Sequence, residues 1–294
     1  MNPTFTRLTE GFGQWLHILG YTERTAKYLP NRIRELFTYM ESQGVCQLEQ
    51  VQKSHMQNWY ACQKTRKNPN TGELLKNHTL NSINSTWRLF GQYLHETDQG
   101  IIPVDIPYEK VIYQERDILT SGQVKSLYNA TDESFLGLFD RAMLSVYYGC
   151  GLRSNEGINL DMSDVLLDKN LLYVRKGKGY KERYVPITGS IHTDFKLYLE
   201  QCRPQLVKDS TEQSFLLNGQ GRRIGYGTLI RRLGILTERA NIEKPIGLHI
   251  LRHSIATHLL QSGMKIEDIA KFLGHAYLSS TQIYTHIVHE HGVF

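Results

Sequence analysis

Apolar residues recur at three- and four-residue intervals through the first hundred positions, and this spacing predicts amphipathic helices. The two clearest apolar stripes are Phe5, Leu8, Phe12, Trp15 and Leu19, and Leu80, Ile83, Trp87, Phe90 and Leu94. Between them, helices are expected over residues 23–42 and 54–67, and Pro30 should bend or interrupt the first of these. The polar stretch NPNTGELLKN precedes the last helix. The pattern therefore predicts a four-helix N-terminal domain over residues 1–100.

A second domain is expected over residues 117–294. The intervening residues 101–116 contain Pro103 and Pro107 and are interpreted as a linker. Within the second domain, LLYVRKGKGYKERYVPI alternates apolar and polar residues on both sides of a Gly-Lys-Gly turn, which predicts a β-hairpin. Helical spacing dominates elsewhere. We therefore expect a mainly α chain whose second domain is α+β, with a small antiparallel sheet from about residue 165 to 187.

Near the C-terminus, an apolar stripe predicts a helix that Gly263 ends. The stripe consists of Leu248, Leu251, Ile255 and Leu259. His249 and Arg252 are three residues apart and therefore share a different face of this helix. The guanidinium group of Arg252 is a planar fork suited to two oxygens of a phosphate, and His249 can donate beside it.

A short helix is expected from Lys265 to Leu273, and Gly274 is placed to end it in a left-handed turn. His275 follows that turn directly, and Tyr284 lies nine residues further on in STQIYTH. A single Tyr or His is usually a packing or surface residue. The joint spacing of these residues with His249 and Arg252 is what favours phosphate chemistry.

The stretch GLRSNEG contributes a further candidate cation. Arg153 follows an apolar helix, after Gly149 and Gly151 allow a tight turn, and Glu156 lies three residues beyond it. Glu156 can either hold the Arg153 guanidinium group in place or cap the new helical turn. Taken alone, the pair is equally consistent with an ordinary surface ion pair.

Composition is compatible with a protein that binds a phosphate backbone. The chain has 294 residues, 40% of them hydrophobic, which suffices for two modest cores. Its formal charge of +5 is small, but basic residues cluster locally, and such clusters are what a phosphate backbone such as that of double-stranded DNA would bind. The residues expected to contact DNA are Lys176, Lys181, Arg183, Arg222, Arg223, Arg231 and Arg232.

Other classes of site find less support in the sequence. His249, His253 and His258 have the spacing of helical zinc ligands, but HExxH, a Cys pair and a carboxylate partner are lacking, so we expect no metal. The four Cys residues are widely spaced and are expected to be reduced thiols. The sequence has no signal peptide and no apolar run long enough to span a bilayer, which indicates a cytoplasmic protein with no membrane partner.

Together, GLR-x-x-E, the basic hairpin and the block from His249 to Tyr284 resemble the tyrosine recombinases, the family of the Xer recombinases and lambda integrase. The resemblance runs from about Asp117 almost to the C-terminus, and the N-terminal helices resemble the core-binding domain of the family. It implies catalysis by Arg153, Lys178, His249, Arg252, His275 and Tyr284, supported by Glu156 and without a cofactor. The chain departs from the family at Asn155 and Gly157, where a small polar and an apolar residue are common.

The resemblance implies that Tyr284 attacks the scissile phosphate to form a 3′-phosphotyrosyl link and that Lys178 protonates the leaving 5′-oxygen. Lys176 and Lys181 are then expected to contact the DNA backbone. His249 is either a hydrogen-bond donor or the base that accepts the tyrosine proton.

The function expected from this resemblance is site-specific DNA recombination through a Holliday junction. The enzyme would assemble as a tetramer on paired sites and associate with the nucleoid. The sequence does not separate integration, excision, inversion and dimer resolution. A type IB topoisomerase and a non-catalytic DNA-binding module are the alternatives.

Overall fold

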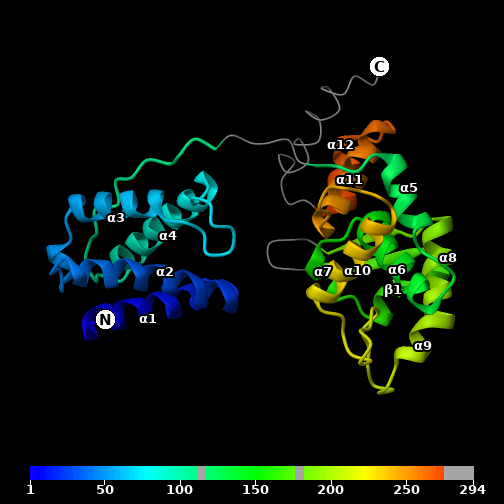
Figure 1. Cartoon of the computed structure of the whole chain (residues 1–294). Helices are drawn as coiled ribbons and strands as arrows, with labels where there is room; N and C mark the ends of the chain where they lie inside the picture. Colours follow the sequence, from blue (N-terminus) through cyan, green and yellow to red (C-terminus); the bar gives the residue numbers. More distant parts are fainter. Residues whose placement is uncertain (112–116, 176–181, 275–294) are drawn as a thin grey trace. The chain divides into compact units, whose positions relative to one another are not determined.

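The computed structural model describes residues 1–111, 117–175 and 182–274, and the chain divides into two compact units, residues 1–114 and 115–294 (Figure 1). Each unit has its own hydrophobic core. The fold is mainly helical with one small antiparallel sheet, as the sequence predicts. No described helix is both long and apolar enough to cross a membrane.

Residues 1–111 of the first unit form four α-helices, which confirms the predicted pattern. They are α1 (Pro3–Ile18), α2 (Glu23–Ser42), α3 (Lys53–Thr65) and α4 (Asn77–Glu96), with a 3₁₀ turn at Leu48–Gln50. Asn2 and Thr22 begin α1 and α2 because their side chains accept hydrogen bonds from backbone amides of the first turn. Aromatic rings of α1, α2 and α4 meet in the core, where Phe12 and Phe37 each pack edge-on against Phe90.

An interruption at Pro30 and the inward position of Leu19 are the two details of the predicted helices that the structure contradicts. Helix α2 continues through Pro30 without interruption, and Pro30 is buried on the face that packs inward. Leu19, predicted to extend the first apolar stripe, is 51% exposed because α1 ends at Ile18 and Leu19 is its C-terminal cap. Leu16 is fully buried in that helix.

Most of the segment predicted to be a linker packs against α4. Ile102 and Ile106 are 6% and 3% exposed and belong to the core of the first unit. Polar side chains along one face of α4 also donate hydrogen bonds to backbone carbonyls of this segment. The pairs are Asn77 with Lys110, Asn81 with Glu109, Asn84 with Ile106, and Arg88 with Ile106. Asn81 binds Glu109 twice, since its side-chain oxygen also accepts from the Glu109 amide at 2.7 Å. Residues 101–111 are therefore part of the first unit.

The second unit contains eight α-helices among its described residues. They are α5 (Ser121–Asn129), α6 (Phe135–Leu144), α7 (Ser154–Ile158), α8 (Gly189–Leu197), α9 (Arg203–Leu206), α10 (Tyr226–Arg239), α11 (Leu248–Gln261) and α12 (Ile266–Leu273). Helices α6 and α8 each continue into a π-helical turn, Ser145–Gly149 and Tyr198–Cys202. Tyr147 and Tyr198 of these turns are fully buried, which places both turns at the centre of the core.

The sheet comprises β1 (Val165–Leu166), β2 (Leu171–Val174) and β3 (Arg183–Pro186) in the order β1-β2-β3, with both pairs antiparallel. Val174 pairs with Arg183 at the open end of the predicted hairpin. Alternate residues of β2 and β3 are buried, so one face of the hairpin packs on the core. The tip of the hairpin, residues 176–181, lies outside the described residues.

Candidate active site

Helices α11 and α12 pack against each other and carry the C-terminal half of the candidate site. Leu248 and Leu251 anchor α11 in the core, at 1% and 0% exposure, and this leaves Arg252 buried on an adjacent face at 4% side-chain exposure. His249 is exposed on the first turn of the same helix. Gly274 ends α12 with φ of 65°, which confirms the predicted left-handed turn immediately before His275.

Arg153 is held at the start of α7. Gly151 precedes it with φ of 60°, and a β-carbon at Gly151 would lie 3.0 Å from the ring of Phe272, so glycine suits both the backbone and the packing there. The Glu156 carboxylate accepts from the Arg153 amide at 2.8 Å and from Arg153 Nη1 at 2.7 Å. The two roles weighed for Glu156, holding the guanidinium group and capping the helix, are therefore performed together.

Three guanidinium groups converge on the C-terminal end of α12. The last carbonyls of a helix lack intrahelical partners and carry partial negative charge, so cationic donors stabilise them. Arg252 donates to the Leu273 carbonyl at 2.6 Å, and Arg153 approaches the same oxygen at 3.3 Å. Arg153 also donates to the Gly274 carbonyl at 3.1 Å, and Arg183 donates to the Phe272 carbonyl at 2.8 Å. Arg252 in addition donates to the Gly151 carbonyl, before α7, at 2.5 Å.

Glu156 is the carboxylate that these cations share within the described part of the chain. Arg183 binds both of its oxygens, at 3.1 and 2.9 Å, and Arg252 Nη1 lies 3.7 Å away. Burial would raise the pKa of this carboxyl group, but hydrogen bonds from Arg183 and Arg153 and the charge of Arg183 lower the pKa to about 2. Glu156 therefore stays ionised at neutral pH and holds guanidinium groups from α7, β3 and α11 together.

The structure thus brings together Arg153, Glu156 and Arg252, which the sequence predicted as one site from widely separated segments. His249 lies on the helix that carries Arg252. Lys176, Lys178, Lys181, His275 and Tyr284 lie outside the described residues, so their predicted roles stay predictions.

Comparison with known proteins identifies the family. The model of the phage integrase family matches residues 117–291, more than half of the chain. The chain belongs to the phage integrase family. Among curated members, it is 29% identical over 290 residues to tyrosine recombinase XerC 2 of Ralstonia nicotianae, covering 97% of this chain and 83% of that protein. It is 36% identical over 209 residues to XerD of Staphylococcus epidermidis, covering 69% of this chain and 70% of the relative.

Solved structures of integrases share the fold. The Tn1549 transposon integrase in complex with transposon right end DNA superimposes with a TM-score of 0.72 at 17% identity, over 94% of both chains. A lambda integrase dimer bound to a core site gives a TM-score of 0.68 at 16% identity, over 95% of this chain and 94% of that one. These matches cover the helical unit as well as the integrase domain.

The basic residues expected to contact DNA do not all face solvent in this chain. Arg232 is 7% exposed, and its guanidinium group forms two hydrogen bonds with Asp140 of α6, so it joins α10 to the core. Arg183 is also buried, because its guanidinium group binds Glu156 and only 7% of its side chain is exposed. Arg223 forms an ion pair with Asp161 at 2.6 Å. Burial removes Arg183 and Arg232 from the predicted contact set.

Arg222 and Arg231 are exposed and stay available for the predicted contact with DNA. The sequence alone did not separate these exposed arginines from the buried Arg183 and Arg232. A charged residue is interpreted as exposed unless a partner is known, and the carboxylates that bury Arg183 and Arg232 are 27 and 92 positions away.

The histidines weighed as an alternative metal site do not form one in the described part of the chain. No group of three or more potential ligands occurs among those residues. His258 instead donates from Nε2 to the Leu119 carbonyl at 2.9 Å, so Nδ1 accepts from the Tyr148 hydroxyl at 2.8 Å. Burial lowers the pKa of His258, which favours the neutral ring that this arrangement needs.

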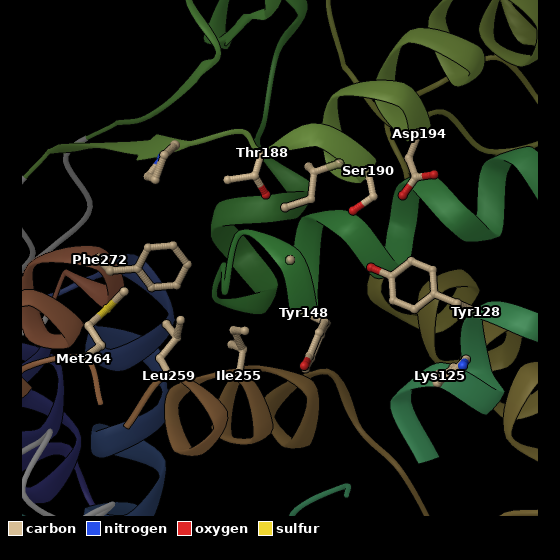
Figure 2. Close-up of a pocket in the computed structure, with 13 residues that line it drawn as sticks. Lys125, Tyr128, Tyr148, Thr188, Ser190, Asp194, Ile255, Leu259, Met264 and Phe272 are labelled. Atoms are coloured by element: carbon tan, nitrogen blue, oxygen red, sulfur yellow. The ribbon is translucent and has the colours of Figure 1, made fainter. Parts of the chain in front are cut away.

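The second unit contains a cavity of about 640 Å³, and Figure 2 shows the residues that line it. Thr188, Ser190 and Asp194 lie across it from Ile255, Leu259 and Met264. Phe272 reaches it from α12, one residue before the carbonyl that Arg252 and Arg153 share. The lining is largely apolar, which is unsuited to a phosphate and suited to an apolar peptide segment.

Proposed function

We propose that this chain is a tyrosine-type, site-specific DNA recombinase that cleaves and rejoins strands through a 3′-phosphotyrosyl intermediate. The observation that carries this proposal is the convergence of Arg153 and Arg252 on the Leu273 carbonyl, two residues before His275. Two planar guanidinium groups held around one point can donate hydrogen bonds to the oxygens of a single phosphate group. Membership of the phage integrase family and relatives named as tyrosine recombinases support the same activity.

In the proposed mechanism, Arg153 and Arg252 bind the non-bridging oxygens of the scissile phosphate. The Tyr284 oxygen attacks phosphorus, the bond to the 5′-oxygen breaks, and Lys178 protonates that oxygen. The arginines and His275 stabilise the charge that develops on the pentacoordinate phosphate, at about 3 kcal/mol per donor. His249 either donates a further hydrogen bond or accepts the tyrosine proton.

The phosphotyrosyl link conserves the energy of the broken phosphodiester bond. A 5′-hydroxyl from a partner strand therefore reverses the reaction without ATP, and exchange of two strands gives a Holliday junction. Fixed guanidinium groups supply the charge stabilisation that a metal ion provides in other phosphoryl-transfer sites. The proposal therefore requires no cofactor.

Replacement of Tyr284 tests the proposed function. Tyr284→Phe deletes the nucleophilic oxygen alone, so we expect no covalent protein–DNA complex on a nicked substrate and DNA binding within a few-fold of wild type. Tyr226→Phe, at a residue 53% exposed on α10, is the matched control and should cleave normally. Cleavage by Tyr284→Phe would refute the mechanism, and relaxation of plasmids that lack a specific site would indicate a topoisomerase instead.

We further propose that the recombinase forms a tetramer on paired DNA sites, which would also associate it with the nucleoid. The occupant that we propose for the largely apolar cavity is the C-terminal segment of a neighbouring copy, because the sequence of this segment contains Ile287, Val288, Val293 and Phe294. Met264 lines the cavity and is 37% exposed, so Met264→Glu should leave single-site binding intact and reduce synapsis of two sites. Leu136→Glu, at an exposed residue outside the cavity, is the control.

A further inference from the structure

Both ends of the predicted Lys178 hairpin are tied down by an arginine bound to carboxylates. At the end of β2, Arg175 contacts Asp161 at 2.6 Å and Asp164 at 2.9 Å. At the start of β3, Arg183 binds both oxygens of Glu156. The two ties differ in exposure, since 49% of the Arg175 side chain and 7% of the Arg183 side chain are exposed.

The two ties also differ in what else they contact. Asp161 and Asp164 lie outside the arginine cluster, whereas Glu156 also binds the amide and guanidinium groups of Arg153. Arg183 further donates from Nε to the Phe272 carbonyl in the last turn of α12. A β-carbon on Gly274 would lie 2.7 Å from Arg183 Nη1, so the guanidinium group packs directly on the turn that precedes His275.

We propose that Arg183 is a positioning residue for DNA cleavage. It joins the β3 end of the hairpin to Arg153 through Glu156, and to the end of α12 through the Phe272 carbonyl. The inference rests on the proposed recombinase function, because Arg153, Lys178 and His275 are the residues that it would align. Arg183 itself does not touch the phosphate, and its effect passes through Glu156 and α12.

The chemistry of the guanidinium group explains why arginine occupies this position. Nη1 and Nη2 bind the two carboxylate oxygens while Nε points to a third acceptor, so one rigid plane fixes three atoms. A lysine ammonium group can replace the charge but not this planar geometry. Without Arg183, the Glu156 carboxylate would interact chiefly with Arg153. This interaction would draw the Arg153 guanidinium group away from the phosphate.

The test compares Arg183→Gln, Arg183→Lys and the matched control Arg175→Gln in the full chain. We expect Arg183→Gln to slow covalent complex formation about 10- to 100-fold, the usual cost of losing a residue that orients an active-site ligand. Binding of the same DNA should stay within about threefold. Arg183→Lys should fall between wild type and Arg183→Gln, and Arg175→Gln should cleave within about threefold of wild type.

A substrate with a neutral methylphosphonate at the scissile position separates positioning from a merely structural role. If Arg183 keeps the charge of Arg153 on the phosphate, the Arg183→Gln defect should shrink to less than about fivefold on this substrate. Equal defects on both substrates, or cleavage at the wild-type rate, would overturn the proposal.

Unfolding of the DNA-free protein tests the tie independently of cleavage. Arg183→Gln and Glu156→Gln should be non-additive, with the double variant losing less stability than the sum of the single losses. Additive losses would refute the tie between Arg183 and Glu156. Failure of the wild-type protein to form a covalent complex would refute the proposed recombinase function instead, because the unfolding measurement needs no DNA.

Discussion

Replacing Glu156 with glutamine should destabilise the second unit by about 3 kcal/mol at pH 7. The pKa of this carboxyl group falls from 4.5 to about 2 in the folded protein, and each tenfold change in proton affinity corresponds to about 1.4 kcal/mol. Only 13% of the side chain is exposed, so solvent screens the interaction weakly. Glutamine retains the shape but removes the charge that Arg153 and Arg183 share.

The effect has a defined dependence on pH. Because the folded-state pKa lies below the unfolded one, the stabilisation is complete above about pH 5.5 and declines as pH falls from 4.5 towards 2. About 1.4 kcal/mol of it should already be lost at pH 3.5. Glu156→Gln cannot titrate at this position, so the difference between the two proteins should narrow over the same range.

The positions of the tryptophans allow unfolding of the two units to be measured separately in one protein sample. Trp15, Trp59 and Trp87 all lie in the first unit, so tryptophan fluorescence follows that unit alone. Circular dichroism follows the helices of both. In urea titrations, Glu156→Gln should move unfolding of the second unit to lower urea concentration. This change should be visible by dichroism and absent from tryptophan fluorescence.

Glu133→Gln is the matched control for Glu156→Gln, because 82% of the Glu133 side chain is exposed in its ion pair with Arg141. The control should change stability by less than about 1 kcal/mol. An unchanged dichroism transition for Glu156→Gln at pH 7, or an equal loss of stability at pH 7 and pH 3.5, would refute the assigned role of the carboxylate.

Three further predictions address the other parts of the chain. Lys178→Ala should cleave normal DNA slowly and recover on a substrate with sulfur at the bridging 5′ position, since a thiolate leaves without a proton; equal defects would make Lys178 a backbone contact. Asn81→Leu leaves the Glu109 amide and carbonyl without their partner and should lower the stability of the first unit by about 1–3 kcal/mol in tryptophan fluorescence. The pKa of His258 is lowered by burial, so the stability of the second unit should decline as pH falls below 6.5, and His258→Gln should remove this decline in dichroism-detected unfolding.

Several elements of the second unit were predicted correctly from local sequence patterns. Helices α11 and α12 follow from apolar spacing and a terminal glycine, and the hairpin follows from alternation around a turn. The pairing of Arg153 with Glu156 could also be predicted from the sequence, because both residues lie in one helical turn. Each of these features depends on residues that are close in sequence.

Predictions failed where the deciding partner is distant in sequence. Prolines identified residues 101–116 as a linker, but side chains of α4, 18 to 33 positions earlier, donate hydrogen bonds to the backbone of residues 101–111. The side-chain amides of the α4 asparagines bind backbone carbonyls of this irregular segment, which lack the backbone partners that a helix or sheet would provide. An asparagine on a helix surface is usually solvated, so nothing local distinguished these from ordinary surface residues.

Gly157 shows how one departure from the family pattern is accommodated. A β-carbon at this position would lie 2.6 Å from the Tyr147 ring, so the fully buried tyrosine already occupies the space that an apolar side chain would fill. The Tyr147 hydroxyl also donates to the Ser154 carbonyl at 3.3 Å, in the first turn of α7. The helix that presents Arg153 and Glu156 is therefore packed from the π-helical turn of α6, and glycine is the residue that admits this packing. A larger residue at position 157 would displace the Tyr147 ring and, with it, the support of the turn that aligns Arg153.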